Sequence, residues 1–381
     1  MKELFEHKNQ CCGCTACINI CPKKAIAMHS DEEGFEYPQI DSTKCIDCGL
    51  CKKVCAFQAE SSFRPSFEQQ AYAAKHKNDH IRMNSSSGGL FSAISDLILS
   101  MGGVVYGAAF DEEFNVVHQR AETPQQCAKF RGSKYVQSDL NTVFDQINKD
   151  LLSERKVLFT GTPCQCAGLK NYLNYSHCTT DNLIICDLVC HGVPSPILWR
   201  DHIKQLTKKG EIQGYYCRPK EISWHASPDL IVYKNGKRDY RSPLSQEHKT
   251  IYYTRTALRP SCHSCKYTTT DRVSDITIAD FWGIEKSMPE FDDEKGISLV
   301  LLNSNKGLEL FHKIKGRLEY KASPIEQCLQ PQLIHPTAPS ANRERFWQDY
   351  QKHGYVYITK KYANVGFIAA LKRVAKKILN R

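Results

Sequence analysis

Two runs of cysteine with the same spacing lie near the beginning of the chain. Cys11, Cys14, Cys17 and Cys21 are followed by Pro22, and the spacing recurs at Cys45, Cys48, Cys51 and Cys55. Doubled runs of this kind ligate two 4Fe–4S clusters, and the fourth cysteine of each run ligates the other cluster. We therefore expect one cluster on Cys11, Cys14, Cys17 and Cys55, and the other on Cys45, Cys48, Cys51 and Cys21.

The sequence departs from the dicluster pattern at two positions, and a different metal could bind the same cysteines. The second run has Ala56 where the first has Pro22, and Cys12 does not fit the register. Zinc is the alternative metal, because C-x-x-C pairs also bind zinc. Eight cysteines in doubled register favour the clusters, so we predict a bacterial-type dicluster ferredoxin domain over residues 1–60.

Four later cysteines suggest a third site. Cys164 and Cys190 each follow a predicted strand, where open α/β sheets bind ligands, and Cys262 and Cys265 form a C-x-x-C pair. Together they could hold a third 4Fe–4S cluster. Three alternatives remain open: a zinc site, a redox dithiol at Cys262 and Cys265, and a role for Cys164 and Cys190 as small buried side chains.

Two polar segments could bind anions. Residues 85–89 precede a predicted helix, whose N-terminal amides suit a cofactor phosphate, although serine is also an ordinary helix cap. Residues 130–135 place Arg131 and Lys134 around a Gly-Ser turn that could clamp a diphosphate. The alternative for this second segment is an ordinary basic loop.

The elements that must position these residues alternate between strand and helix. This alternation predicts an α/β core with some parallel strands. We expect a linker over 57–70 and a β-rich excursion over 212–255 with a hairpin turn at Asn235-Gly236. Strands are predicted over 71–76, 104–110, 156–160, 183–190, 276–279 and 297–302, and helices over 90–100, 163–172, 196–208 and 362–379.

Composition narrows the class of protein. The chain has 381 residues, 19 cysteines and a polar N-terminus, and no apolar run approaches about 18 residues. These features predict a cytoplasmic protein of two or three domains. The net charge of +10 is concentrated in part near the C-terminus. No nucleic-acid-binding motif accompanies this charge, so we predict no nucleic-acid partner.

Several stretches resemble one protein family. Residues 86–91, 161–169, 187–195, 260–265, 274–276 and 280–283 are similar, in this order, to the coenzyme F420 hydrogenase/dehydrogenase beta subunit family, and the resemblance spans about residues 70–330. It implies bound FAD and, in several members, a 4Fe–4S cluster within the flavin domain. By motif match, the expected cluster ligands are Cys164, Cys190, Cys262 and Cys265, and the expected FAD contacts are Ser86, Ser87, Gly88, Gly89, Arg131, Gly132, Ser133, Lys134, Gly161, Thr162 and Pro163.

The resemblance completes the predicted organisation. The fold class is α+β and α/β: the ferredoxin domain is followed by a mixed α/β flavin-binding domain over residues 61–355 and a basic amphipathic helix over 356–381. That helix could touch a membrane surface, but docking on the protein or a partner is favoured. His191 and Asp280 are the predicted catalytic residues near the flavin, with a structural hydrogen bond as the alternative for each.

The predicted function is that of an iron–sulfur flavoprotein oxidoreductase. It would pass electrons between a small-molecule two-electron donor or acceptor, coenzyme F420 being one example, and ferredoxin-type clusters through FAD. Its electron partner would be a ferredoxin-like carrier or a partner redox enzyme. The alternative is an electron-transfer subunit that serves a partner enzyme and has no substrate site of its own.

Overall fold

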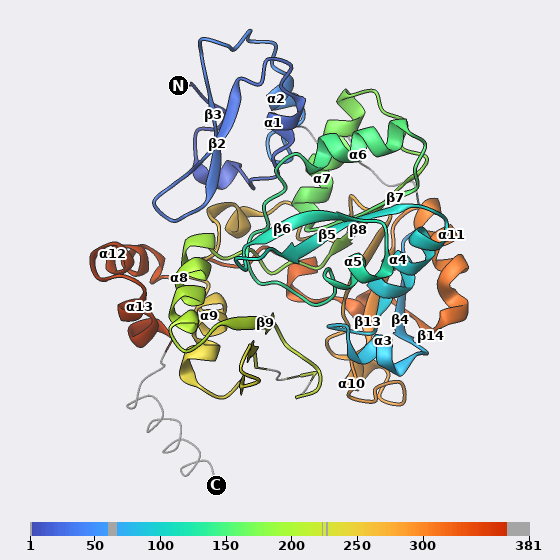
Figure 1. The fold of residues 1–381 in the computed structure, drawn as a ribbon. Coiled ribbons are helices and arrows are strands. Elements are labelled where there is room, and N and C mark those ends of the chain that lie inside the picture. The colour runs from blue at the N-terminus through green and yellow to red at the C-terminus, as the bar shows by residue number, and fades with distance from the viewer. Residues whose placement is uncertain (1, 60–66, 223, 226–227, 364–381) are drawn as a thin grey trace.

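The computed structural model describes residues 2–59, 67–222, 224–225 and 228–363. A small N-terminal unit of short strands and helices packs against a larger mixed α/β unit (Figure 1). The predicted fold class is therefore confirmed. The predicted domain bounds at residues 60 and 355 stay predictions.

The N-terminal unit is built around the two cysteine runs. Its antiparallel sheet has the order β1-β3-β2, and its helices α1 (Ala16–Ile20) and α2 (Leu50–Lys53) begin at equivalent positions of the two runs. Both N-caps, Thr15 and Gly49, have left-handed backbones with φ of 62° and 73°. This conformation turns the chain sharply within each run, so that the chain of each run curves around one point. The strands are β1 (Lys2–Glu3), β2 (Ile26–Ser30) and β3 (Glu36–Ile40).

The larger unit has an eight-stranded sheet with the order β14-β4-β13-β12-β8-β7-β5-β6. The four strands β12, β8, β7 and β5 are parallel, and the outer strands are antiparallel to their neighbours. The carboxyl ends of the four parallel strands therefore meet at one edge. The bounds are β4 (Gln70–His76), β5 (Val104–Phe110), β6 (Val116–Ala121), β7 (Val157–Gly161), β8 (Leu183–Leu188), β12 (Ile276–Asp280), β13 (Ser298–Leu302) and β14 (Leu318–Ser323).

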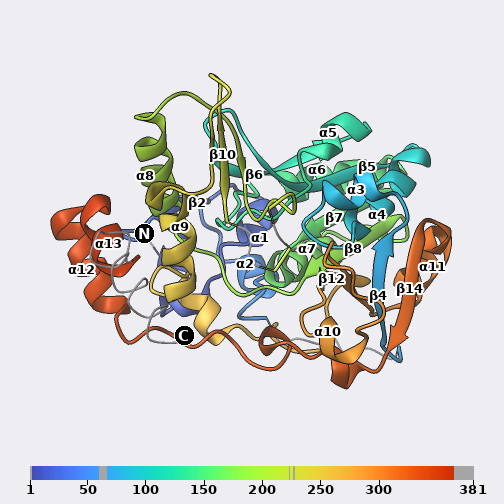
Figure 2. The ribbon, with the colours of Figure 1, turned by 90° about the horizontal axis from the view of Figure 1, so that it is seen from below.

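Helices cover both faces of this sheet (Figures 1 and 2). Tyr106 and Phe159 point to the face covered by α6 (Val143–Leu152) and α7 (Pro163–Tyr175). Their neighbours Val105 and Leu158 point to the opposite face, which α4 (Leu90–Ser100) and α11 (Asn305–Ile314) cover. Alternate side chains of a strand point to opposite faces, so these apolar runs bury both sides of the sheet.

The N-terminal unit shares a hydrophobic core with the face carrying α6 and α7. Ala16, Val54 and Ala56 are buried in that core. The Asn171 amide of α7 donates to the Val54 carbonyl (3.4 Å), and the Tyr267 hydroxyl donates to the Ala56 carbonyl. The two cysteine runs are thus held against the helix that follows β7.

The region over 212–255 is only partly β. Strands β9 (Ile212–Tyr216), β10 (Leu230–Tyr233) and β11 (Arg238–Asp239) form a small sheet, with the predicted turn at Asn235-Gly236. The prediction was wrong for residues 243–254, which form helix α9 (Pro243–Thr254). Ser242 caps it by accepting from the Ser245 N–H (3.1 Å), and Pro243 occupies its first turn. These are helix-start signals that the β prediction overlooked.

Other helices complete the unit. The predicted helix over 196–208 is confirmed as α8 (Pro196–Thr207), whereas most of the predicted C-terminal helix lies outside the described residues. Within the described ranges, no helix is both long enough and apolar enough to cross a membrane. The remaining α-helices are α3 (Asp79–Met83), α5 (Pro124–Ala128), α10 (Ile284–Ser287), α12 (Arg343–His353) and α13 (Tyr355–Tyr362), and the 3-10 helices are η1 (Lys8–Gln10), η2 (Pro260–Ser264), η3 (Lys315–Arg317), η4 (Ile325–Cys328) and η5 (Pro331–Leu333).

Candidate functional site: three sets of cysteine thiols and a polar strand edge

The structure gathers the thiols predicted for the first cluster. Cys11, Cys14, Cys17 and Cys55, here called the inner set, line one cavity of the N-terminal unit. Burial raises the pKa of Cys17 well above its usual value, and the adjacent thiols Cys14, Cys11 and Cys55 add to this rise. Cys55 therefore lies beside the first run, as expected for the crossed ligand pattern, and its assignment to that cluster stays a prediction.

The outer set consists of Cys21, Cys45, Cys48 and Cys51. Burial raises the pKa of Cys51, and its neighbours Cys48 and Cys21 raise it further. Cys21 accepts a hydrogen bond from the Ala25 N–H (3.3 Å), and Cys45 accepts one from the Asp47 N–H (3.5 Å). Cys48 is exposed. The proximity of Cys21 and Cys48 to Cys51 agrees with the crossed pattern, and the assignment of all four as ligands of one cluster stays a prediction.

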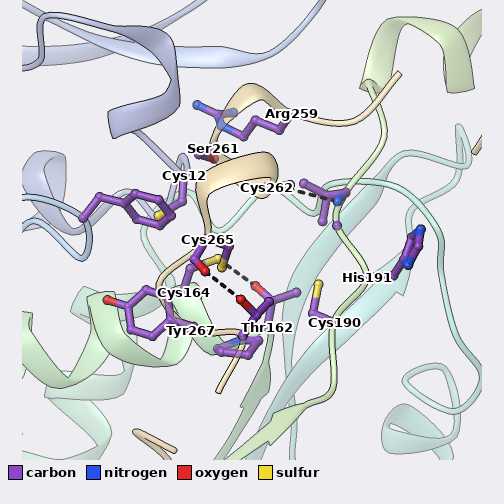
Figure 3. A pocket seen from close by; sticks show the side chains of 15 residues that line it. Cys12, Thr162, Cys164, Cys190, His191, Arg259, Ser261, Cys262, Cys265 and Tyr267 are labelled. Atoms are coloured by element: carbon purple, nitrogen blue, oxygen red, sulfur yellow. Dashed lines mark hydrogen bonds between the residues drawn. The ribbon is translucent and has the colours of Figure 1, made fainter. Parts of the chain in front are cut away.

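The third set, Cys164, Cys190, Cys262 and Cys265, lines a cavity at the carboxyl ends of β7 and β8 (Figure 3). Cys164 lies in the first turn of α7, Cys190 follows β8, and the other two lie on and after η2. The Val193 N–H donates to the Cys262 sulfur (3.4 Å). Three distant segments of the chain thus bring four thiols together.

The donor chemistry of the third set fits a metal cluster. Burial raises the pKa of Cys190, Cys262 and Cys265 to about 12 each, so these thiols are protonated at neutral pH without a metal. Four thiolates are the ligands of 4Fe–4S clusters and also of structural zinc. Among the described residues, no group of three or more His, Cys, Asp or Glu side chains is arranged around a single metal-ion position.

Cys12 lies between the inner and third sets. It lines both cavities, and the neighbouring thiols of Cys14 and Cys164, together with burial, raise the pKa of Cys12 well above its usual value. The sequence marked Cys12 only as a residue outside the ligand register. In the structure it is the point at which two predicted cluster sites adjoin.

Helix α7 reaches both sites, and Gly168 makes its approach to the inner set feasible. A Cβ atom on Gly168 would lie 2.7 Å from the Cys14 sulfur and 2.9 Å from its Cβ. Cys164 lies one turn earlier on the same helix. One helix therefore positions a thiol of the third set and accommodates a thiol of the inner set.

Gly168→Ala is expected to displace Cys14 and to reduce iron binding by the inner set. The added methyl group overpacks a closed contact, which costs about 1–3 kcal/mol of stability. Iron content and the unfolding temperature of the purified variant measure both effects. Gly316→Ala is the matched control, because its Cβ would meet no atom within 4 Å. An alanine at position 168 that leaves iron content unchanged would contradict this packing role.

The two predicted phosphate segments lie side by side. The Ser133 N–H donates to the Ser86 hydroxyl (2.8 Å). Gly88 is tightly enclosed, since a Cβ there would lie 2.2 Å from the Ala74 carbonyl oxygen. Helix α4 begins at Leu90, and its N-cap Gly89 supplies no side-chain cap, so its first amides remain available to an anion.

Other members of these segments already have structural partners. The Lys134 ammonium donates to the carbonyls of Phe130, Arg131 and Gly132, and burial lowers the pKa of Lys134 to about 8. The Ser87 hydroxyl donates to the Ile297 carbonyl (2.8 Å). The segment over residues 161–163 joins β7 to α7, and Thr162 and Pro163 line the cavity of the third set. All these residues stay predictions as FAD contacts.

The two predicted catalytic residues have different surroundings. His191 lines the cavity of the third set; its Nδ1 contacts the Gln332 amide (2.9 Å), and its buried Nε2 has no partner among the described residues. Burial lowers the pKa of His191. Asp280 is paired with Arg218 (2.7 Å) and accepts from the Trp224 indole (3.0 Å). The unpartnered nitrogen makes His191 the better placed of the two for proton transfer.

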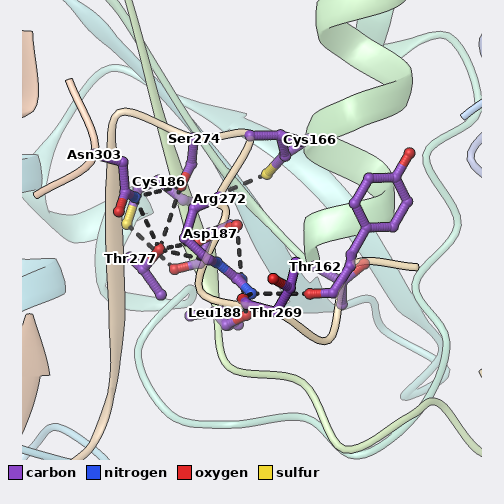
Figure 4. A network of polar contacts seen from close by, with 12 residues as sticks. Thr162, Cys166, Cys186, Asp187, Leu188, Thr269, Arg272, Ser274, Thr277 and Asn303 are labelled. Carbon is purple, nitrogen blue, oxygen red and sulfur yellow. Dashed lines mark hydrogen bonds and ion pairs between the residues drawn. The ribbon is translucent and has the colours of Figure 1, made fainter. Parts of the chain in front are cut away.

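A buried ion pair supports the segment that leads to Cys190. Asp187, at the end of β8, is paired with Arg272 at 2.8 Å, and their side chains are 0% and 1% exposed (Figure 4). The Thr277 hydroxyl donates to the same carboxylate (2.5 Å), and the Arg272 guanidinium also donates to the Leu188 carbonyl (3.0 Å). These bonds join β8 to β12 directly before the third set.

Comparisons with known proteins agree with this arrangement. Residues 10–59 match the family of 4Fe-4S dicluster domains, and residues 154–327 match the family described as the C terminus of the coenzyme F420 hydrogenase/dehydrogenase beta subunit. The methylamine utilization ferredoxin-type protein MauM of Methylobacillus flagellatus is 35% identical over 57 residues, which are 14% of this chain and 24% of that protein.

A solved structure is also similar. In the F420-reducing NiFe hydrogenase complex from Methanosarcina barkeri, one chain aligns with a TM-score of 0.47 and 17% identity, covering 77% of this chain and 90% of that chain. The predicted family resemblance is confirmed by the two family matches. The chain thus joins an N-terminal segment that matches 4Fe–4S dicluster domains to a later segment that matches the C terminus of the coenzyme F420 hydrogenase/dehydrogenase beta subunit.

Proposed function

We propose that this protein is an FAD- and iron–sulfur-dependent oxidoreductase. It exchanges electrons between a small molecule that gives or takes a hydride and a ferredoxin-like carrier. The small molecule would bind at the carboxyl edge of the parallel strands, and the carrier would bind at the outer set. The family described as F420 hydrogenase/dehydrogenase makes coenzyme F420 the first small molecule to test.

The observation that carries the proposal is the adjacency of the three thiol sets. The exposed Cys48 and its neighbour Cys51 belong to the outer set, Cys51 also lines the inner cavity, and Cys12 lines the inner and third cavities. The path ends at the strand edge, beside His191. A continuous series of cluster sites from the surface to a sheet edge suits an electron relay better than a zinc scaffold.

The protein's own residues would orient the cofactors and exclude water. The uncapped amides of α4 and the nearby Arg131 would hold an FAD phosphate, and His191 would hold or release a proton through Nε2. When bound, FAD supplies the exchange between two-electron and one-electron transfer, and 4Fe–4S clusters supply single-electron steps. The protein would keep these groups close together and in a fixed order.

Turnover by the purified full chain tests the proposal. Reduced coenzyme F420 is supplied anaerobically with a viologen dye as electron acceptor, and dye reduction is followed by absorbance. Steady dye reduction supports an oxidoreductase with its own substrate site. Cluster reduction that occurs only after a partner enzyme is added would instead identify the chain as an electron-transfer subunit.

The cytoplasmic location stays a prediction.

Basic residues around the outer set favour an acidic carrier. Lys52 and Lys53 are exposed beside Cys51, and Lys23 and Lys24 are exposed shortly after Cys21. Because Cys21 lies near enough to Cys51 to raise the pKa of its thiol, these two pairs flank the same set. Complementary charges of this kind accelerate encounter with an oppositely charged partner.

Reversing the charges of Lys52 and Lys53 to Glu is expected to slow association with an acidic ferredoxin by about tenfold at low ionic strength. Stopped-flow reduction of the outer cluster by a reduced ferredoxin measures the rate, and the difference should fade as salt is raised. Reversing the exposed Lys208 and Lys209 at the end of α8 is the control. Equal slowing by both double variants would show that only net charge matters.

A further inference from the structure

A buried arginine lies where the inner and third thiol sets adjoin. Arg259 is 0% exposed, and it directly precedes η2, which carries Cys262. Its carbonyl accepts from the Cys262 N–H (2.9 Å), and its own N–H donates to the Val193 carbonyl (2.9 Å). The backbone of Arg259 thus belongs to the loop that presents the third set, and its side chain lines that cavity (Figure 3).

The side chain reaches into the N-terminal unit. Its guanidinium donates to the Cys11 carbonyl (2.8 Å), the Glu36 carbonyl (2.8 Å), the Gln137 side-chain oxygen (2.9 Å) and the Cys11 sulfur (3.6 Å). The last contact is to a thiol of the inner set. One residue therefore joins the backbone of the third set to a sulfur of the inner set.

The surroundings of this cation contain thiols in place of a carboxylate. The four hydrogen-bond acceptors are two carbonyls, an amide and a sulfur. The ionisable neighbours that act most strongly on Arg259 are Cys11, Tyr37, Cys12 and Cys262. The Tyr37 ring lies 4.3 Å from the guanidinium carbon. A charge removed from water in this way requires compensation by an opposite charge.

We propose that Arg259 is a positioning residue whose counter-charge is the iron–sulfur clusters themselves. A 4Fe–4S cluster with four thiolates is anionic and gains one more negative charge on reduction, so an adjacent fixed cation favours the reduced form. Hydrogen bonds to the sulfur and nearby charge are known determinants of cluster potential. Arg259 would thus raise the reduction potential of the inner cluster and that of the third cluster.

The position of Cys12 explains why both clusters are affected. Cys12 lines the cavities of both sets, and Arg259 lines the cavity of the third set while donating to the Cys11 sulfur of the inner set, so a single cation at this junction lies close to both sites. Gly13 keeps the approach open, since a Cβ there would lie 2.9 Å from an Arg259 nitrogen. The junction would hold both clusters at potentials reachable from the same carrier.

The test is a redox titration of the anaerobically purified full chain, followed by electron paramagnetic resonance of the reduced clusters. Arg259→Gln is expected to shift the midpoint potentials of two clusters to more negative values. The outer cluster, on Cys21, Cys45, Cys48 and Cys51, should titrate as before and serve as an internal reference. Arg259→Lys keeps the charge and should retain most of the original potential although it loses the forked hydrogen bonds.

The controls separate charge from structure. Arg120→Gln removes an arginine whose charge is already balanced by Asp150, and its potentials should not change. If Arg259→Gln fails to load iron, Arg259→Lys carries the test, because a lysine variant whose potentials fall would overturn the proposal. Unchanged potentials in an iron-loaded Arg259→Gln would also overturn it.

The inference rests on the proposed cluster sites, and different results would rule out the proposed function and the role of Arg259. If the unaltered protein binds no iron at the inner or third set, the proposed function is wrong. If it binds iron there and the midpoint potentials are the same in the Arg259 variants as in the unaltered protein, only the role of Arg259 is wrong.

Discussion

Cys164→Ser is expected to leave about eight irons per chain where the unaltered protein holds about twelve. Cys164 lies in the first turn of α7 and faces Cys190, Cys262 and Cys265 across a shared cavity. A serine oxygen is a poor substitute for a soft thiolate ligand, so the third cluster should be lost. Iron and acid-labile sulfide, measured on protein purified without oxygen, give the result.

Two further serine variants sharpen the measurement. Cys178→Ser is the matched control, because Cys178 lies beyond the far end of α7 and lines neither thiol cavity. Cys12→Ser should keep about twelve irons, since Cys12 is outside the ligand register. Loss of iron from the Cys12 variant and full retention in the Cys164 variant would exchange the roles of these two thiols.

Arg272→Met is expected to lower the free energy of unfolding by about 3–5 kcal/mol. The substitution leaves the fully buried carboxylate of Asp187 without its partner. Burial already raises the pKa of Asp187, and the guanidinium of Arg272 opposes that rise. Because Asp187 is the next-to-last residue of β8, three positions before Cys190, the damage should extend to the third set and reduce its iron content.

Denaturant unfolding, monitored at equal protein concentration, measures the loss. Combining Arg272→Met with Asp187→Asn removes the unpaired charge and should recover a large part of the stability. Arg155→Met is the comparison, because Arg155 pairs with Glu122 at the surface and should cost only about 0–1 kcal/mol. A buried-pair variant that unfolds like the surface variant would refute the role assigned to this network.

The thiol sets could be anticipated from sequence because ligand spacing is largely local. Cys11, Cys14 and Cys17 reach one centre from a single loop, and the crossing of Cys55 follows from the doubled pattern. The strands that end near Cys164 and Cys190 were also recognisable as short apolar runs followed by glycine or proline. The FAD-contact residues rested on resemblance, and of these the structure brings Ser86 and Ser133 together.

The junction between the sets was not predictable. Cys12, Gly168 and Arg259 have no distinctive spacing, and their roles arise only when segments more than 90 positions apart pack together. Lys134 shows the opposite difficulty. Its charge suggested a phosphate contact, but the side chain is folded onto three carbonyls of its own loop. The sequence shows that such a residue is charged, but it does not show where the side chain points.

We propose that three adjoining thiol sets connect a flavin site to the exposed edge of the dicluster domain. The most direct test is one anaerobic purification of the full chain, with iron, sulfide, zinc and flavin measured on the same sample. We predict about twelve irons, about twelve sulfides and about one FAD per chain, with no zinc. About eight irons together with zinc, or protein free of flavin, would contradict the claim.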